Sequence, residues 1–269
     1  MTLSVCMAGA TGWAGRPIAE AVIEAADLEL TSAVSRSAAG RDLGEAWGVE
    51  PNGVPVFGAV AEGVDGVDVV IDYTSHDAVR ANSLAAIERG VAVVIGSSGL
   101  AASDFADLDA AAREAGVGVV AARNYSLTAA MAQAAALLVA RYLPSWEIID
   151  YASAKKPDAP SGTARELAER LAQIQPPVVD VPVNETSGHR EARGATVAGT
   201  QIHSVRLPSF VVSTETVFAL PDERLTIRHD AGSSATPYIA GTLLAVRKVT
   251  SRIGLVRGLD TLLLEAIAL

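Results

Sequence analysis

A glycine-rich turn near the start of this 269-residue chain constrains its fold more than any other feature. The turn spans residues 9–15, has the pattern G-x-x-G-x-x-G, and lies between an apolar run at residues 3–8 and a helical spacing at residues 17–26. This order is typical of dinucleotide binding, because glycines let the backbone approach a pyrophosphate and the helix N-terminus stabilises its charge. An ordinary strand-to-helix turn also uses glycine, but the early position favours binding. The expected cofactor-binding residues here are Gly9, Ala10, Thr11, Gly12, Trp13 and Ala14.

Short apolar runs alternate with helical spacings as far as about residue 125. Further strands are expected at residues 28–34, 67–72, 91–95 and 117–121, and helices at residues 77–89 and 104–115. Ser103 is placed to cap the second of these helices. Strands that alternate with helices form parallel sheets with helices on both faces. We therefore predict an α/β fold that begins with a Rossmann-type, doubly wound parallel sheet.

The pattern changes after residue 125 and indicates a second domain of the α+β class. Expected helices are residues 128–142 and 162–173, and expected strands are residues 146–151, 201–207, 210–219 and 224–229, with a long polar loop at residues 175–193. The hairpin-length connections predict an antiparallel or mixed sheet. Residues 236–269 return to a helical pattern. We assign residues 1–125 and 232–269 to the first domain and residues 126–231 to the second.

Composition excludes several functional classes. A net charge of −10 without a basic cluster argues against nucleic-acid binding, and 50% hydrophobic residues indicate a globular core. Cys6 is the single cysteine, so no internal disulfide can form, which fits a reducing compartment. The sequence shows no signal-type segment and no apolar run of membrane-spanning length. We expect a cytoplasmic protein with no membrane partner, and we predict no metal ligands.

The end of the second strand indicates which cofactor is bound. NAD sites usually place an acidic residue there to bind the ribose 2′-hydroxyl, whereas this chain has Ser35, Arg36 and Ser37. Arg36 can pair with a 2′-phosphate, and the two hydroxyls can donate to it. Arg36 could also be an ordinary solvated arginine. The pattern favours NADPH and leaves NADH possible.

Two later loops also follow strand ends, where ligands of open parallel sheets bind. Small residues at 96–98 can approach a nicotinamide ring, and residues 124–125 follow the next strand near the expected domain junction. Each loop could equally be ordinary turn chemistry, and their shared placement favours binding. The predicted residues are Gly96, Ser97, Ser98, Asn124 and Tyr125.

Residues 150–164 predict a site for a small carboxylate substrate. Lys155 and Lys156 precede a proline-bracketed turn, and Ser161, Gly162 and Thr163 open a helix. Ammonium groups beside a helix N-terminus attract an anion, because the dipole and the free N–H groups both favour negative charge.

The sequence resembles the dihydrodipicolinate reductase family over nearly its whole length. Residues 156–164, KPDAPSGTA, match the family pattern K-x-D-A-P-S-G-T-A, which is highly specific. Residues 96–99 and 122–126 correspond to the family forms G-T-T-G and A-P-N-F-S, and residues 193–194 and 203–208 give weaker matches. The resemblance implies an NAD(P)H-binding first domain and a second domain that binds substrate and forms the oligomer, typically a tetramer.

The resemblance also implies hydride transfer to a cyclic, unsaturated dicarboxylate of the lysine and diaminopimelate pathway. Lys156 matches the family's proton donor, and Gly162 and Thr163 match the residues that hold a substrate carboxylate. The family pattern E-x-H-H-x-x-K, however, places two histidines where this chain has Ala152 and Ser153. Alanine cannot transfer a proton, and a serine hydroxyl is a poor acid near neutral pH. We take Lys156 and Ser153 as the candidate catalytic residues.

Three interpretations follow from this departure. A reductase of the family type with an altered imine, alkene or 2-oxo carboxylate substrate comes first, because two replacements at the chemical centre fit poorly with an unchanged substrate. The family reaction with Lys156 as the sole acid comes second. A non-catalytic NADPH-binding sensor comes third, since the retained carboxylate-binding residues could serve a sensor too.

Overall fold

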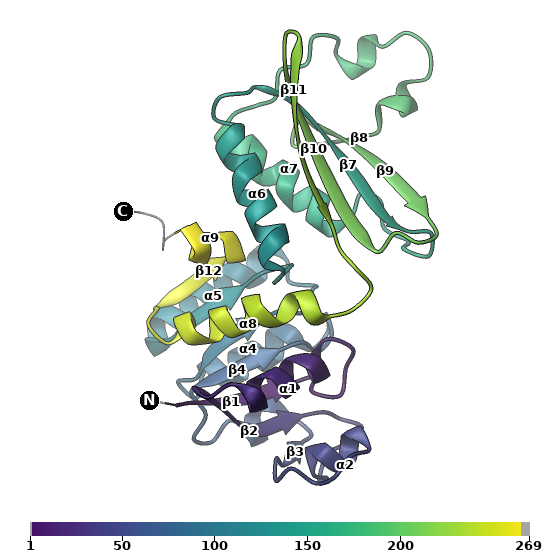
Figure 1. Ribbon diagram of the computed structural model, residues 1–269. Helices are drawn as coiled ribbons and strands as arrows, with labels where there is room; N and C mark the ends of the chain where they lie inside the picture. The colour runs from purple at the N-terminus through teal and green to yellow at the C-terminus, as the bar shows by residue number, and fades with distance from the viewer. Residues whose placement is uncertain (1, 265–269) are drawn as a thin grey trace. The chain divides into compact units, whose positions relative to one another are not determined.

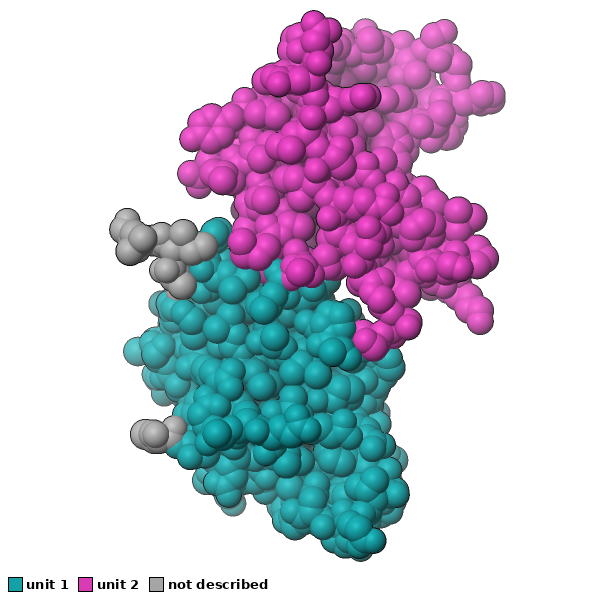
Figure 2. Space-filling view, in the orientation of Figure 1, with its two compact units in different colours: residues 1–127, 235–269 teal, residues 128–234 magenta. Residues whose placement is uncertain are grey.

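The computed structural model describes residues 2–264, which form two compact units. One unit is Met1–Leu127 with Ala235–Leu269, and the other is Thr128–Ser234 (Figure 2). Residues 265–269, which the sequence analysis assigns to the first domain and to a helical pattern, lie outside the described residues.

A seven-stranded sheet forms the centre of the first unit, and every strand pairing in it is parallel. Its order is β12-β6-β5-β4-β1-β2-β3. The strands are β1 (Leu3–Ala8), β2 (Leu28–Val34), β3 (Val56–Phe57), β4 (Val69–Asp72), β5 (Ala92–Ile95), β6 (Gly118–Ala121) and β12 (Gly254–Arg257). The predicted doubly wound parallel sheet is thus confirmed.

Helices cover both faces of this sheet (Figure 1). They are α1 (Gly15–Glu24), α2 (Leu43–Trp47), α3 (Val60–Gly63), α4 (Val79–Ile87), α5 (Ala102–Ala115), α8 (Thr236–Val249) and α9 (Leu259–Leu264). Helix α1 packs beside α8, while α3 and α5 each pack beside α4. Because both faces are covered, every residue of β4, β5 and β6 is buried, which explains why these strands read as continuous apolar runs.

The second unit contains a mixed five-stranded sheet of order β11-β10-β7-β9-β8. Only the pairing of β7 with β9 is parallel. The strands are β7 (Ser145–Ser153), β8 (Ala195–Val197), β9 (Thr200–Leu207), β10 (Val212–Leu220) and β11 (Glu223–Asp230). Burial alternates along β7, as expected for a sheet with one covered face.

Two helices, α6 (Leu127–Val139) and α7 (Gly162–Ile174), lie on the covered face (Figure 1). Ile148 and Phe218 from the sheet and Leu171 from α7 are fully buried and belong to one apolar cluster. Two short 3-10 turns, Val183–Glu185 and Arg190–Arg193, interrupt the long polar loop that joins α7 to β8. Within residues 2–264, each helix falls short of the length and apolar character that a bilayer crossing requires.

Two local predictions were wrong. Ser103 does not cap α5, because the helix begins one residue earlier, at Ala102, and the Asp104 carboxylate accepts a hydrogen bond from the Ala101 N–H at 2.7 Å. The expected helical pattern after residue 236 is interrupted by β12, which pairs in parallel with β6 at the edge of the sheet. Gly254, with φ of +85°, allows the chain to turn into this strand.

Candidate functional site

The glycine turn of the first unit is folded so tightly that side chains are excluded. Gly9 has φ of +87°, and a Cβ atom there would lie 2.4 Å from the Tyr73 carbonyl oxygen. A Cβ atom on Gly15 would lie 2.0 Å from the Gly9 carbonyl oxygen. Both glycines are therefore required by the backbone path, which brings the start of α1 against the end of β1.

The N-terminus of α1 is open to an anion. Its N-cap residue, Ala14, makes no side-chain capping hydrogen bond, and the first turn contains no acidic residue. Trp47, from α2, donates from its indole Nε1 to the Ala10 carbonyl oxygen at 3.0 Å and fixes the turn from the side. Uncapped N–H groups beside a glycine backbone fit a pyrophosphate, so the residues present suit a dinucleotide.

Hydroxyl groups gather where β1 and β2 end. Thr11 Oγ1 and Ser35 Oγ are 2.8 Å apart, and Ser35 Oγ and Ser37 Oγ are 3.3 Å apart. Arg36 is exposed beside them, and it forms no ion pair with any residue between 2 and 264. The structure thus brings together the Ser35 and Ser37 hydroxyls predicted for a 2′-phosphate and adds that of Thr11. Arg36 lies between the two serines in the chain.

Trp13 projects from the glycine turn and is 62% exposed. Its ring meets that of Tyr238, near the start of α8, edge-on with 6.0 Å between centroids. An aromatic side chain this exposed beside the glycine turn is accessible to a ligand.

A buried carboxylate joins the loops that follow β4 and β5. Asp72 Oδ1 accepts hydrogen bonds from the Thr74 N–H at 2.9 Å, from the Thr74 hydroxyl at 2.7 Å and from the Ser97 hydroxyl at 2.6 Å. Its other oxygen accepts from Asn82 Nδ2 at 2.9 Å. Asp72 is fully buried, so these bonds fix Ser97 in place, while the neighbouring Ser98 is exposed.

The ring of Tyr73 lies directly against Gly96. A Cβ atom on Gly96 would approach this ring to 2.2 Å, so the loop can take its path only with glycine. The Tyr73 hydroxyl lies 2.8 Å from Thr242 Oγ1 on α8.

Asn124 and Tyr125 follow β6 and differ in their surroundings. Asn124 is half-buried, and its Oδ1 accepts from the Ser126 N–H at 2.9 Å. Tyr125 is buried and donates to the carbonyl oxygens of Ile95 and Val120. Burial raises the pKa of this hydroxyl well above its ordinary value. The Tyr125 side chain therefore braces the ends of β5 and β6 from within the core.

The second candidate site lies in the second unit, at the end of β7. Lys156 Nζ is 2.7 Å from Asp158 Oδ1, and Lys155 is exposed. Ser153 Oγ accepts from the Lys155 N–H at 3.3 Å. Ala152 is fully buried in the strand.

The start of α7 leaves two backbone donors free. Ser161 caps the helix, because its Oγ accepts from the Ala164 N–H at 3.3 Å, and its own N–H donates to Asp150 Oδ2 at 2.8 Å. Among residues 2–264, the N–H groups of Gly162 and Thr163 have no hydrogen-bond acceptor, because they open the helix. Free N–H groups at a helix N-terminus can hold a carboxylate.

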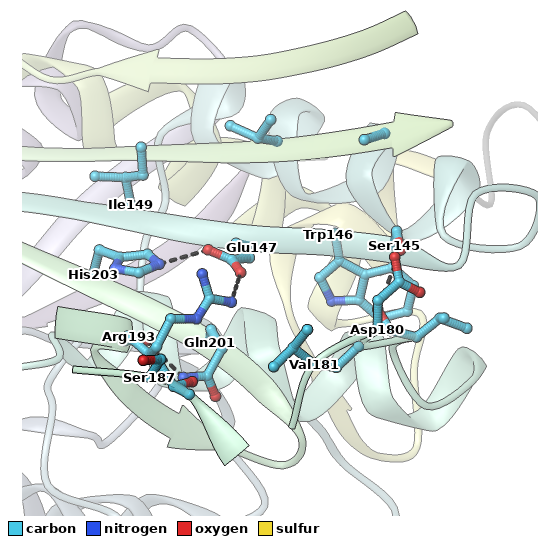
Figure 3. A pocket seen from close by; sticks show the side chains of 15 residues that line it. Ser145, Trp146, Glu147, Ile149, Asp180, Val181, Ser187, Arg193, Gln201 and His203 are labelled. Atoms are coloured by element: carbon cyan, nitrogen blue, oxygen red, sulfur yellow. Dashed lines mark hydrogen bonds and ion pairs between the residues drawn. The ribbon is translucent and has the colours of Figure 1, made fainter. Parts of the chain in front are cut away.

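A separate cavity of about 710 Å³ opens beside the sheet of the second unit (Figure 3). It lies between the loop at residues 178–187 and strands β7, β9 and β10. Glu147 points into it and binds His203 Nε2 at 2.6 Å and Arg193 through its other oxygen. None of the predicted catalytic or substrate-binding residues lines this cavity. Within residues 2–264, no group of His, Cys, Asp or Glu side chains is arranged to hold a metal ion.

Two supporting residues of the first unit, Trp47 and Asn82, are not predicted from the sequence. Trp47 is 37 positions from the carbonyl oxygen to which it donates, and Asn82 lies inside α4. Neither belongs to a recognisable motif, so no local signal marks them.

Comparisons with known proteins give a consistent result across the chain. Two family models match, described as dihydrodipicolinate reductase N-terminus over residues 3–125 and C-terminus over residues 125–263. The 4-hydroxy-tetrahydrodipicolinate reductase of Thermosynechococcus vestitus is 38% identical over 97% of both chains. That of Moorella thermoacetica is 37% identical over 97% of this chain and 98% of its own.

A solved structure also matches over nearly the full length. A dipicolinate-bound dihydrodipicolinate reductase from Paenisporosarcina sp. TG-14 has a TM-score of 0.83 and is 28% identical. The match covers 97% of this chain and 99% of that one.

The contact between Lys156 and Asp158 can be tested by titration. The hydrogen bond and charge of Lys156 hold the pKa of Asp158 below its ordinary value, so this pair stabilises the fold above the ordinary pKa and loses that contribution as pH falls through the lowered value. We expect Lys156→Met to return the pKa toward normal, measured by NMR of the carboxyl carbon. A pKa that Lys156→Met leaves unchanged would show that the contact does not form in solution.

Proposed function

The chain belongs to the dihydrodipicolinate reductase family of oxidoreductases, and we propose that it reduces a C=N or C=C bond of a small carboxylate with a bound nicotinamide cofactor. The observation that supports this best is the start of α7, where the N–H groups of Gly162 and Thr163 open the helix after the Ser161 cap and follow Lys156 by six and seven residues in the chain. A 2-oxo carboxylate is the further substrate class that this site suits.

The first unit supplies the binding groups for the dinucleotide. When bound, the cofactor supplies the hydride. The N-terminus of α1 and the glycine turn would hold the pyrophosphate, and Thr11, Ser35, Arg36 and Ser37 would surround a 2′-phosphate. These groups favour NADPH over NADH. Ser97, fixed by Asp72, and Asn124 would contact the nicotinamide half.

Lys156 would donate the proton that completes the reduction. Its ammonium group lies 2.7 Å from Asp158 Oδ1, and this contact holds the group in one position. Lys155 would add positive charge for the carboxylate, and the Ser153 hydroxyl would donate a hydrogen bond. The site has one ammonium group as its proton donor, because Ala152 is a buried methyl group where the family pattern has a histidine.

The missing imidazoles support a substrate other than hydroxy-tetrahydrodipicolinate. A methyl and a hydroxymethyl group are smaller than two imidazoles, so a less polar substrate that carries a single carboxylate suits the site. Hydroxy-tetrahydrodipicolinate itself is the second candidate. It is favoured by the activity for which the relatives at 37–38% identity are named and by the intact residues 156–164.

A turnover assay separates these possibilities. Purified protein is given NADPH with hydroxy-tetrahydrodipicolinate, then with a panel of imines and 2-oxo acids, and loss of NADPH absorbance is followed. We expect turnover with a panel member to exceed that with hydroxy-tetrahydrodipicolinate. Lys156→Ala should lower kcat by about 10²–10⁴-fold, the usual contribution of a general acid. Lys248→Ala, which removes the one lysine outside the site, is the matched control.

Two results would contradict the proposal. Turnover of hydroxy-tetrahydrodipicolinate faster than that of every other substrate would overturn the altered specificity. The assignment as a reductase would then still stand. Tight NADPH binding without turnover of any compound would favour a sensor.

Arg36 should decide the choice of cofactor. A charge-assisted hydrogen bond contributes about 1.5–3 kcal/mol, so Arg36→Ala should weaken NADPH binding by about 10–100-fold and change NADH binding little. Dissociation constants from fluorescence titration provide the measurement, and Arg41→Ala, another exposed arginine nearby, is the control. Equal losses for both cofactors would refute the 2′-phosphate contact.

We also propose that the protein is a homo-oligomer, with a tetramer expected from the family resemblance. Val178 and Val181 are 52% and 58% exposed beside the cavity of the second unit, and Leu225 on β11 is 42% exposed. Light scattering should give a mass above the 27.6 kDa of one chain. Val181→Asp should reduce it, whereas Val49→Asp, equally exposed in the first unit, should not. A monomer at all concentrations would exclude this assembly.

A further inference from the structure

A buried ion pair lies beneath the carboxylate site of the second unit. Asp150, on β7, is fully buried, and its Oδ2 is 2.7 Å from Arg206 Nη2 on the adjacent strand β9. The guanidinium also donates from Nη1 to the Asp150 carbonyl oxygen at 3.1 Å. Ser204 donates to the same carboxylate oxygen at 3.2 Å. The pair therefore joins two neighbouring strands near the end of the sheet.

The remaining hydrogen bonds of this pair hold the turn that carries the candidate catalytic lysine. Arg206 Nη2 donates to the Asp158 carbonyl oxygen at 2.8 Å, and Asp150 Oδ2 accepts from the Ser161 N–H at 2.8 Å. Asp158 follows Lys156 by two residues, and Ser161 is the N-cap of α7. One end of the turn is thus fixed by the guanidinium and the other by the carboxylate.

These two hydrogen bonds determine where the Lys156 ammonium group lies relative to the start of α7. Fixing Asp158 fixes the partner of the Lys156 ammonium group. Fixing Ser161 orients the first turn of α7 and hence the free N–H groups of Gly162 and Thr163. The ion pair touches neither a reacting group nor a free donor, but it sets the distance between them.

The pair is poorly suited to a purely stabilising role. Asp150 Oδ1 and Arg206 Nε are both buried, and neither has a hydrogen-bond partner between residues 2 and 264. Removing two charges from water is costly, and apolar residues of similar volume often replace such pairs without loss of stability. The pair makes hydrogen bonds to the turn at residues 158–161, which apolar side chains could not make.

We propose that Asp150 and Arg206 are positioning residues that hold the Lys156 ammonium group and the start of α7 in the arrangement needed for reduction of a carboxylate substrate. This inference deepens the proposed function and rests on it. If the pair is replaced, we expect the position of the Lys156 ammonium group to change and the stability of the fold to be retained.

Arg206→Lys tests the planar, forked geometry of the guanidinium. A lysine keeps the charge but cannot reach Asp150 and the Asp158 carbonyl with the same fork. Misplacement of a catalytic group by about 1 Å typically costs about 10²-fold, so we expect kcat/KM to fall by about that factor. The NADPH dissociation constant, which reports on the first unit, should stay unchanged.

The double variant Asp150→Leu with Arg206→Met separates positioning from folding. Replacing both charges at once avoids leaving either one buried alone. We expect a melting temperature close to that of the wild type, with kcat/KM still about 10²-fold lower and dipicolinate binding, measured by calorimetry, weakened. Arg247→Lys is the matched control, because Arg247 makes a bidentate contact with Asp27 at an exposed position of the first unit.

One readout does not depend on turnover. In Arg206→Lys, the carboxyl of Asp158 should titrate closer to its ordinary value, because the contact with Lys156 loosens. Wild-type kcat/KM and an unchanged Asp158 titration in this variant would overturn the positioning role. Recovery of full activity together with stability in the double variant would also overturn it. Absence of wild-type turnover with every substrate would instead refute the proposed function, and the titration of Asp158 would still decide the role of Arg206.

Discussion

Hydrogen bonds to a buried carboxylate hold each of the two candidate sites in place. Asp72 at the end of β4 accepts from Thr74, Ser97 and Asn82, and Asp150 near the end of β7 accepts from Ser161 and Arg206. Loops after strands are normally the most mobile part of a sheet protein. A charged acceptor makes stronger hydrogen bonds than a neutral one, and it must keep them because an unpaired buried charge is costly. The carboxylates therefore give these loops the rigidity that a binding site needs.

Both candidate sites offer backbone N–H groups to an anion. In each unit a helix, α1 or α7, begins directly after a tight turn of the backbone. No acidic side chain lies in the first turn of either helix. At α1 the close approach depends on the absence of side chains at Gly9 and Gly15. At α7 it depends on the Ser161 cap and the turn before it. Binding by N–H groups requires only that the backbone keep its conformation. Steric exclusion at the glycines and the Ser161 cap therefore determine these N–H positions more than the identity of nearby side chains does.

The sequence predicts those features that local pattern determines. The glycine turn and the apolar runs of β4, β5 and β6 predict the parallel sheet, because these strands are covered on both faces. The short edge strand β12 carries no such signal, since only two of its four residues are large and apolar, and its pairing with β6 arises from tertiary structure. The contact between Asp150 and Arg206 joins residues 56 positions apart. A pattern read along the chain cannot reveal that two charges meet inside a protein.

The division between backbone and side-chain groups allows the proposed anion site at the start of α7 to match the family pattern while residues 152 and 153, at the end of β7, differ from it. The groups at Gly162 and Thr163 that could donate to a carboxylate are backbone N–H groups, so they persist as long as Ser161 caps α7. Proton transfer depends on side chains, and at residues 152 and 153 these are a buried methyl and a half-exposed hydroxyl. Substitution there changes the chemistry without disturbing the hydrogen bonds that Asp150 and Arg206 make to the turn. Under the proposed function, the end of β7 is therefore a position where the reaction could change while the N–H groups at the start of α7 stay in place.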